Sequence, residues 1–315
     1  MTERAFTVLV PATSGNVGPG FDVLGLALSL WNETDFILPE EGEGWSAEIA
    51  GEGTDFLPRD ASHLTLQAVR QVYEFVGAEP PRALKIRARN RIPVSSGLGS
   101  SASAVLAGLL GGNHLLGGPL SREQILALAT EMEGHPDNAA PALWGGFTTA
   151  WRAASGEVRA LSLPLAPAWH KEKRLAVVLP AVRLSTQESR AVLPKSVPRA
   201  DAVFNLGRVV LLLEALRRDE PALLAEALQD RLHQPYRLPL IRGAEAALEA
   251  ALEAGAWAVA LSGAGPSIIA FAPATALAEV LQAMMSAFAD AGVEARGFTL
   301  KVPEHGATVK LSLSA

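Results

Sequence analysis

The chain has 315 residues, a formal net charge of −6 at pH 7, no cysteine and 49% hydrophobic residues. This length allows one large domain or two modest ones, and the lack of cysteine excludes disulfides and thiolate metal sites. The acidic balance argues against a nucleic-acid partner, which usually requires a basic patch. No apolar run reaches the roughly 18 to 20 residues that span a membrane, and the N-terminus lacks the apolar core of a signal peptide. These features predict a cytoplasmic protein without a membrane partner.

The first half of the chain is predicted to contain both strands and helices. Residues 83–89 alternate between apolar and charged side chains, which is typical of a half-buried strand. Residues 62–76 carry their apolar side chains on one helical face. The other predicted elements are strands at 6–10 and 35–38, helices at 102–116 and 125–133, a capping-type helix start at 121–124, and a strand after the turn at 145–146.

The second half begins after residues 163–169, a proline-punctuated segment that is the best candidate boundary between two lobes. Beyond it we predict strands at 175–179, 257–261, 268–271 and 297–302, and helices at 201–217, 221–228 and 275–291. Because strands and helices intermix without strict βαβ alternation, the pattern predicts an α+β fold.

The most informative segment is PVSSGLGSSAS at residues 93–103, between a predicted strand and a predicted helix. The free backbone N–H groups of a helix N-terminus point outward, and the helix dipole adds positive potential, so such a turn binds anions. Glycine lets the backbone approach a phosphate closely, and the serine hydroxyls add ligands for phosphate oxygens or Mg²⁺. The segment therefore predicts a phosphate site.

Other interpretations of this loop fit less well. A plain turn capping the helix leaves the density of Gly and Ser unexplained. Residues 97–102 match the loose G-x-G-x-x-A dinucleotide pattern, but no strand that closes with an acid follows about 20 residues later. A Walker A loop needs a Gly-Lys pair, and the chain contains none. Backbone, hydroxyls and Mg²⁺ would have to balance the phosphate charge instead.

Three ordered motifs resemble those of the GHMP kinases, a family that includes galactokinase, mevalonate kinase and homoserine kinase. They are VPATSGNVGPGFD at 10–22, the loop at 93–102 and LSGAGPS at 261–267. The resemblance covers almost the whole chain. It implies an N-terminal ATP-binding lobe, residues 1–163, similar to the second domain of ribosomal protein S5. It also implies a ferredoxin-like C-terminal lobe, residues 164–315, with the nucleotide between the two.

The resemblance implies that ATP and Mg²⁺ bind at the loop. Its matched positions predict Ser101 and Glu131 as metal ligands, with Glu131 preferred over Glu133. Many homoserine kinases have Asn near the adenine where this chain has Ser62–His63, so the base contacts are less well defined. The nucleotide-binding residues that the family pattern implies are Pro93, Val94, Ser95, Ser96, Gly97, Leu98, Gly99, Ser100, Ser101, Ala102 and Ser103, with Gly263 and Gly265 bracing them from below.

The segment HPDNAAP at 135–141 resembles the homoserine kinase branch of the family. That branch implies phosphorylation of the L-homoserine hydroxyl by ATP, a step toward threonine. A carboxylate such as Asp22 suits an ammonium group, and two arginine forks suit a carboxylate. The resemblance implies Asn16, Asp22, His135, Asp137, Thr186, Arg190 and Arg237 as substrate contacts, and Ser101, Glu131, Asp137 and Asn138 as catalytic residues.

Several alternatives stay open at this point. Asp137 is either a catalytic base or a substrate contact, in which case the hydroxyl proton passes directly to the transferred phosphate. Another GHMP kinase, acting on mevalonate or a sugar, is the nearest alternative, although such substrates lack an ammonium group for Asp22. A catalytically silent ligand sensor would be expected to lose the metal carboxylate or the loop serine, and neither is lost. A homodimer is implied by the resemblance alone.

Overall fold

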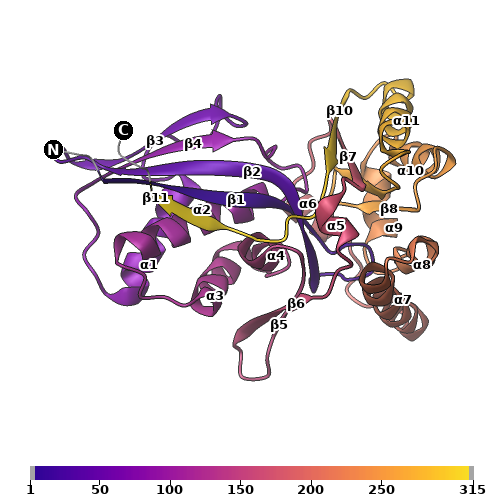
Figure 1. The fold of residues 1–315 in the computed structure, drawn as a ribbon, viewed down its shortest axis with the longest axis horizontal. Coiled ribbons are helices and arrows are strands. Elements are labelled where there is room, and N and C mark those ends of the chain that lie inside the picture. Colours follow the sequence, from indigo (N-terminus) through magenta and orange to yellow (C-terminus); the bar gives the residue numbers. More distant parts are fainter. Residues whose placement is uncertain (1–3, 312–315) are drawn as a thin grey trace.

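Two β-sheets organise the chain, and the computed structural model describes residues 4–311 (Figure 1). Within these residues the larger sheet has seven strands in the order β11-β1-β2-β4-β3, with β5 pairing β2 and β6. Its neighbours are antiparallel except β3 and β4. The strands are β1 (Arg4–Gly15), β2 (Leu24–Leu38), β3 (Gly44–Gly51), β4 (Ala83–Asn90), β5 (Phe147–Arg152), β6 (Val158–Leu163) and β11 (Thr308–Leu311).

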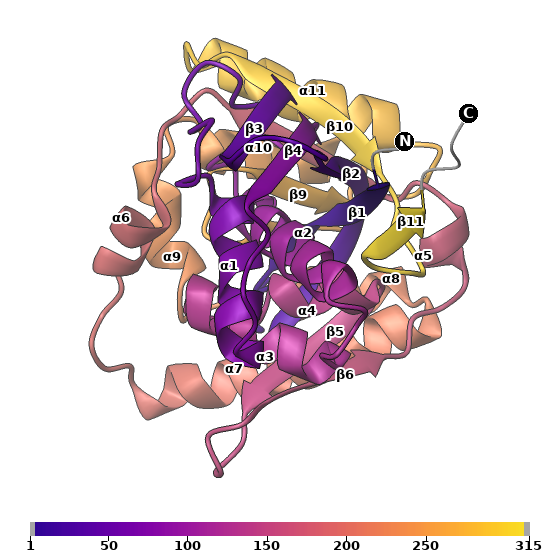
Figure 2. The ribbon, with the colours of Figure 1, turned by 90° about the vertical axis from the view of Figure 1, so that its left-hand side faces the viewer.

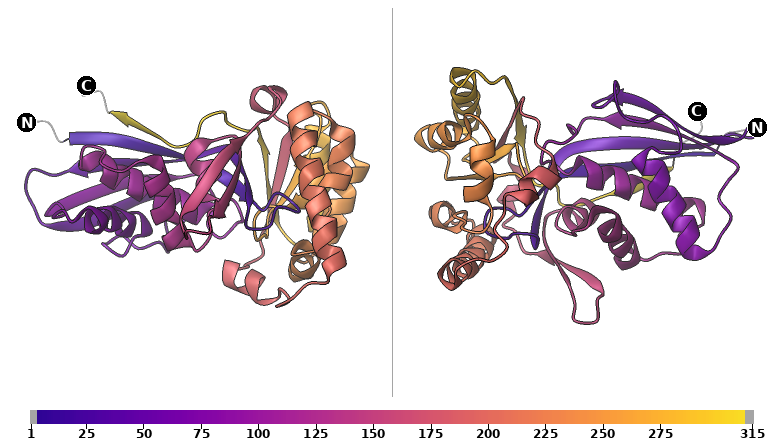
Figure 3. Two further views of the ribbon diagram at one scale, coloured as in Figure 1. Left: turned by 90° about the horizontal axis from the view of Figure 1, so that it is seen from below. Right: turned by 180° about the vertical axis from the view of Figure 1, so that it is seen from behind.

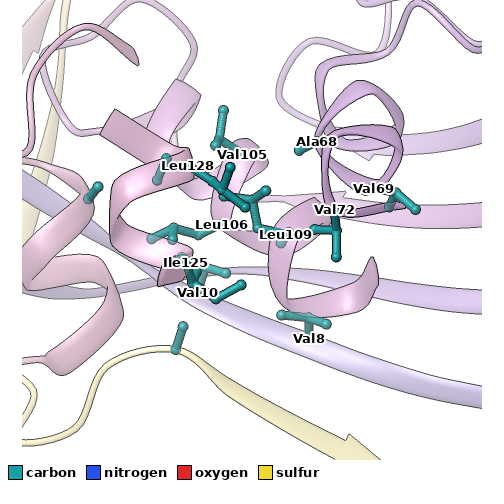
Figure 4. Close-up of a cluster of buried hydrophobic side chains, with 14 of the residues drawn as sticks. Val8, Val10, Ala68, Val69, Val72, Val105, Leu106, Leu109, Ile125 and Leu128 are labelled. Atoms are coloured by element: carbon teal, nitrogen blue, oxygen red, sulfur yellow. The ribbon is translucent and has the colours of Figure 1, made fainter. Parts of the chain in front are cut away.

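Four helices cover one face of this sheet (Figures 1 and 2). They are α1 (Leu64–Val76), α2 (Ser100–Leu115), α3 (Arg122–Glu133) and α4 (Ala139–Trp144). Branched apolar side chains such as Val10, Leu106 and Ile125 are fully buried between helices and sheet (Figure 4). Complete burial of each stabilises the fold by about 1.5–3 kcal/mol. The predicted capping box at the start of α3 is confirmed, with Ser121 as the N-cap.

The close packing of α1 on α2 brings two helix starts to one place. A Cβ at Gly108 would lie 2.1 Å from the carbonyl oxygen of Thr65, so glycine alone allows this approach. The Thr65 hydroxyl donates to the carbonyl of Ala104 at 3.1 Å. The first turns of α1 and α2 therefore face the same space.

The smaller sheet has the strand order β10-β7-β9-β8 and is antiparallel throughout. Helices connect β7 to β8 and β9 to β10, which gives the β-α-β-β-α-β order of a ferredoxin-like lobe. The predicted α+β class is confirmed. The strands are β7 (Leu175–Pro180), β8 (Ala258–Leu261), β9 (Ile268–Phe271) and β10 (Ala295–Leu300); the helices are α5 (Ala168–Lys171), α6 (Thr186–Ala191), α7 (Arg199–Arg218), α8 (Pro221–Ala227), α9 (Gln234–Arg237), a 3₁₀ turn (Leu238–Leu240), α10 (Ala244–Glu253) and α11 (Leu277–Asp290).

The two lobes lie next to each other along the long axis of the molecule (Figure 3), and they share one apolar core where they meet. Leu24, Leu98 and Phe147 from the larger lobe belong to the same buried cluster as Trp169 and Phe271 from the smaller one. Because this cluster is continuous, a site between the lobes rests on a packed support.

The last strand does not follow the predicted boundary at residue 163. After β10 the chain returns to the larger lobe, where β11 pairs with β1 and Leu311 lies opposite Phe6. The C-terminal lobe predicted as 164–315 therefore loses residues 308–311 to the first sheet. No helix within residues 4–311 is both long enough and apolar enough to cross a membrane.

Candidate active site

A cavity of about 470 Å³ lies between the lobes and is lined by all three sequence motifs. This volume is in the range of roughly 300–1,000 Å³ that is usual for small-molecule sites. The lining residues are Asn16, Asp22, Asn32, Thr34, Leu57, Pro58, Ser62, His63, Leu64, Thr65, Gln67, Asn90, Val94, Ser95, Ser96, Gly97, Gly99, Ser100, Ser101, Ser103, Ala104, Glu133, His135, Asp137, Asn138, Thr186, Arg190, Arg237, Gly263 and Ala264.

The Gly/Ser loop lies on a turn of the smaller lobe. Ser95, Gly97 and Gly99 have φ values of 54°, 78° and 70°, so the loop turns through three left-handed residues. A Cβ at Gly97 would lie 2.3 Å from the carbonyl oxygen of Ser262, and the Ser262 hydroxyl donates to the carbonyl of Gly97 at 2.8 Å. The turn at 262–265 therefore supports the loop from below and directs the N-terminus of α2 into the cavity.

Four of the predicted nucleotide contacts do not line this cavity. Leu98 is completely buried in the core shared by the lobes, and Ala102 faces inward from α2. Pro93 is buried behind the loop. Gly265 lies below the loop, with its carbonyl oxygen 2.7 Å from the position of a Cβ at Gly97. Successive side chains on a helix differ in direction by roughly 100°, so a continuous run cannot face one ligand.

The carboxylate that reaches the loop belongs to Glu133. Its Oε1 accepts a hydrogen bond from the Ser101 hydroxyl at 2.5 Å, and burial raises the pKa of this carboxyl group. Glu131 is exposed and lies outside the cavity. The prediction that Glu131 faces the loop serine is therefore wrong. Two residues along a helix rotate a side chain by roughly 200°, so only one of the pair can face the loop.

The donor set around the loop suits a hard cation that also binds a phosphate. Within residues 4–311 no group of three or more His, Cys, Asp or Glu side chains forms a ready-made metal site. Ser101 and Glu133 provide two oxygen donors at the cavity wall. Mg²⁺ usually takes one or two carboxylates and completes its shell with phosphate oxygens and water, so these residues fit that ion.

The segment after α3 forms a polar network that reaches back to β1. His135 Nδ1 lies 2.6 Å from Oδ1 of Asp137, which is 2% exposed. This hydrogen bond raises the pKa of His135. Asn138 donates to the same oxygen at 3.2 Å and accepts from the Thr13 hydroxyl at 2.8 Å. The network holds the three predicted residues His135, Asp137 and Asn138 at the cavity.

The first motif and α6 contribute opposite charges. Arg190 donates to both carboxylate oxygens of Asp22, at 2.6 and 3.0 Å. Asn16 donates to the carbonyl of Gly263 at 2.7 Å and accepts from the backbone N–H of Asp22 at 3.0 Å. Both ends of the Asn16 amide are engaged, so Asn16 positions Asp22. Thr186, one helical turn before Arg190, also lines the cavity.

Arg237 enters the cavity from the other side of the same cluster. Its Nε donates to the carbonyl of Ser189 at 3.1 Å, and Nη1 contacts Nδ1 of His233 at 3.2 Å. Burial lowers the pKa of the guanidinium, which is 1% exposed. The structure thus brings the predicted residues Asp22, Arg190 and Arg237 together at one end.

The opposite end of the cavity was missed by the sequence interpretation, apart from Ser62–His63. His63 caps α1, where its Nδ1 accepts from the backbone N–H of Thr65 at 3.2 Å, and burial lowers its pKa. Leu57 and Pro58 provide an apolar wall. The remaining residues of this end lie on strands or in the first turns of α1, where no local motif marks them: Asn32, Thr34, Gln67 and Asn90.

Known proteins share both halves of this arrangement. The family models for the GHMP kinases N terminal domain and the GHMP kinases C terminal match residues 63–146 and 212–290. A homoserine kinase of Synechococcus sp. (strain WH7803) is 44% identical over 304 residues, which are 96% of this chain and 95% of the relative. A homoserine kinase of Prochlorococcus marinus (strain MIT 9303) is 42% identical over 306 residues, which are 96% of this chain and 95% of that relative. The crystal structure of homoserine kinase from Cytophaga hutchinsonii ATCC 33406 superimposes with a TM-score of 0.85 at 30% identity and covers 98% of both chains.

Proposed function

The chain belongs to the GHMP kinase family, and from that premise we propose that it is a homoserine kinase. It transfers the terminal phosphoryl group of ATP to the side-chain hydroxyl of L-homoserine and releases O-phospho-L-homoserine and ADP. The observation that carries the substrate assignment is the cluster of Asp22, Arg190 and Arg237 at one end of the cavity. A zwitterionic amino acid uses both signs of charge there, whereas a sugar or mevalonate offers no ammonium group.

The charged end would hold the head of the amino acid. Asp22 pairs with the ammonium group, and the two guanidinium groups bind the carboxylate, a pairing in which the fork geometry of arginine is effective. Asp22 and Arg190 also pair with each other. A bound amino acid would present an opposite charge to each of them. The hydroxyl of the bound amino acid then extends toward Asp137 and Asn138.

The loop and the start of α2 would hold the phosphates. Phosphoryl transfer depends mainly on positioning and on neutralising charge, and a helix N-terminus supplies N–H groups aimed at an anion. Ser101 and Glu133 would hold Mg²⁺, which neutralises charge on the transferring phosphoryl group when bound. The nucleoside would occupy the end formed by Leu57, Pro58 and His63.

The surroundings of Asp137 support an orienting role over that of a general base. His135 and Asn138 both bind its Oδ1, which fixes the orientation of the carboxylate. A carboxylate held in this way is oriented to accept a hydrogen bond from the substrate hydroxyl. We therefore propose that the hydroxyl proton passes to the transferred phosphoryl group.

A coupled assay of ADP release tests the function. We expect turnover with L-homoserine and not with mevalonate, galactose or shikimate; faster turnover with one of the others would reject the assignment. ATP binding without turnover on any substrate would favour the silent sensor, which the presence of Ser101 and Glu133 disfavours. The homodimer and the cytoplasmic location stay predictions, to be tested by sedimentation and by cell fractionation.

A further inference from the structure

Within the described residues, one nitrogen of the Arg237 guanidinium, Nη2, has no hydrogen-bond partner. Nε and Nη1 are bound by Ser189, His233 and Gly263, the last at 3.5 Å. No hydrogen bond within residues 4–311 involves Nη2, although Arg237 lines the cavity and is 1% exposed. A buried cation with one nitrogen available toward the cavity is suited to an anionic ligand group.

The protonation of His233 follows from its two partners. Its Nε2 lies 2.7 Å from the carbonyl oxygen of Gly18, which can only accept, so Nε2 carries the proton. Its Nδ1 lies 3.2 Å from Nη1 of Arg237, which can only donate, so Nδ1 accepts. The ring is therefore neutral, in agreement with the burial that lowers the pKa of this completely buried side chain.

The ring is also fixed in orientation. Asp230 accepts from the backbone N–H groups of His233 and Gln234 at 2.9 and 2.7 Å, which sets the start of α9. Phe21 stacks on the imidazole with ring centroids 5.3 Å apart, and the Arg237 guanidinium lies 5.4 Å from the centre of the Phe21 ring. His233 thus contacts both the loop that carries Asp22 and the arginine one helical turn away.

We propose that His233 is a positioning residue that couples the two halves of the amino-acid site. One hydrogen bond holds the Gly18–Asp22 loop, and the other holds Arg237. A single rigid ring thereby sets the spacing between the carboxylate that binds the ammonium group and the guanidinium that binds the carboxylate. An α-amino acid carries both groups on one carbon, so it requires a fixed spacing. The inference rests on the proposed function.

Two variants separate the two hydrogen bonds. In His233→Gln the amide nitrogen reaches the position of Nε2, so the donor to Gly18 is kept and the acceptor for Arg237 is lost. In His233→Asn the amide oxygen takes the position of Nδ1, so the acceptor is kept and the donor is lost. His305→Gln is the matched control, because His305 is exposed and lies outside the cavity.

Each protein is tested with L-homoserine and with 3-aminopropan-1-ol, which has the ammonium and hydroxyl groups but no carboxylate. We expect His233→Gln to raise the KM for L-homoserine roughly ten-fold, as for a weakened charge-assisted hydrogen bond. The KM for 3-aminopropan-1-ol and for ATP, and kcat, should stay near the wild-type values. His233→Asn should raise the KM for both amino substrates by similar factors, because it loosens the loop that carries Asp22.

If His233→Gln raises the KM for both amino substrates equally, or raises neither, the coupling role is overturned. A wild-type protein that does not turn over L-homoserine overturns the proposed function instead, so the two failures are distinguishable. Nitrogen-15 NMR of histidine provides a readout on the wild-type protein that does not depend on how the variants fold. The His233 signal should be that of the neutral Nε2–H tautomer at pH 7; an Nδ1–H tautomer or an imidazolium would refute the proposal.

Discussion

Arg190 and Asp22 form a bidentate ion pair that joins the two lobes, although 168 positions separate them in the chain. Their side chains are 38% and 33% exposed. Exposed ion pairs contribute about 0–1 kcal/mol because solvent screens them. Under the proposed function, a ligand that carries both charges would therefore replace this pair at little cost.

Replacing Arg190 by leucine should raise the KM for L-homoserine by roughly ten- to hundred-fold, because a charge-assisted hydrogen bond to the carboxylate is lost. The KM for ATP should change little. Steady-state kinetics with each substrate varied in turn measures both values, and Arg199→Leu, at an exposed arginine outside the cavity, is the control. Arg237→Leu should raise the KM for L-homoserine by a similar factor. An unchanged KM for L-homoserine in both variants would remove the carboxylate clamp and favour a different substrate.

Glu133→Gln should lower kcat by roughly 10²–10³-fold, the usual cost of losing one group that stabilises transition-state charge. Glu131→Gln is a matched control on the same helix, and its kcat should stay near that of the wild type because Glu131 is exposed outside the cavity. Single-turnover rates at saturating Mg²⁺ and ATP make the comparison. The reverse pattern would restore Glu131 as the metal carboxylate.

The His135–Asp137 pair should make a pH-dependent contribution to stability. The hydrogen bond from His135 to Asp137 raises the pKa of His135 above its ordinary value of about 6.5. The contribution is then complete below about pH 6.5 and is lost as the pH rises through the raised pKa. Urea unfolding should show a difference in unfolding free energy between wild type and His135→Gln that is constant below about pH 6.5 and shrinks above it. A difference that is independent of pH would contradict this.

Gly97→Ala should destabilise the protein and weaken ATP binding, because the new methyl group would meet the carbonyl of Ser262 at 2.3 Å. Overpacking of this kind costs about 1–3 kcal/mol beyond the strain of a left-handed alanine. Gly117→Ala is the matched control, since Gly117 has a similar φ of 82° and no atom within 4 Å of the added Cβ. Urea unfolding and calorimetry with ATP compare the two. If the two variants lose stability and ATP affinity equally, the contact of Gly97 with the 262–265 turn is unimportant.

The parts of the site that the sequence predicted are local. A glycine-rich turn before a helix, or HPDN after one, is a contiguous motif, and its residue types alone suggest the chemistry. The choice between Glu131 and Glu133 depends on the helical phase of the last turn of α3, which two candidates separated by one residue do not reveal. Gly99 lines the cavity, and a Cβ there would also meet the Thr13 hydroxyl at 2.0 Å. That glycine is required by the packing of the loop on β1.

The parts that the sequence did not predict arise from contacts distant in the chain. Asn32 and Thr34 lie on β2 and become cavity residues only because α1 and the 52–63 segment fold over them. The last strand, β11, is four residues long, too short for its alternation to stand out. Its partner is β1, at the other end of the sequence.

Because the chain returns to form β11, two covalent connections, or straps, join the smaller lobe to the larger one. The chain leaves the larger lobe after β6 and re-enters it between β10 and β11. Two covalent connections limit twisting of one lobe against the other more than a single connection would. One cut in the first strap would leave the lobes tethered through the second. Truncation before β11 would both release that tether and leave β1 as an unpaired edge.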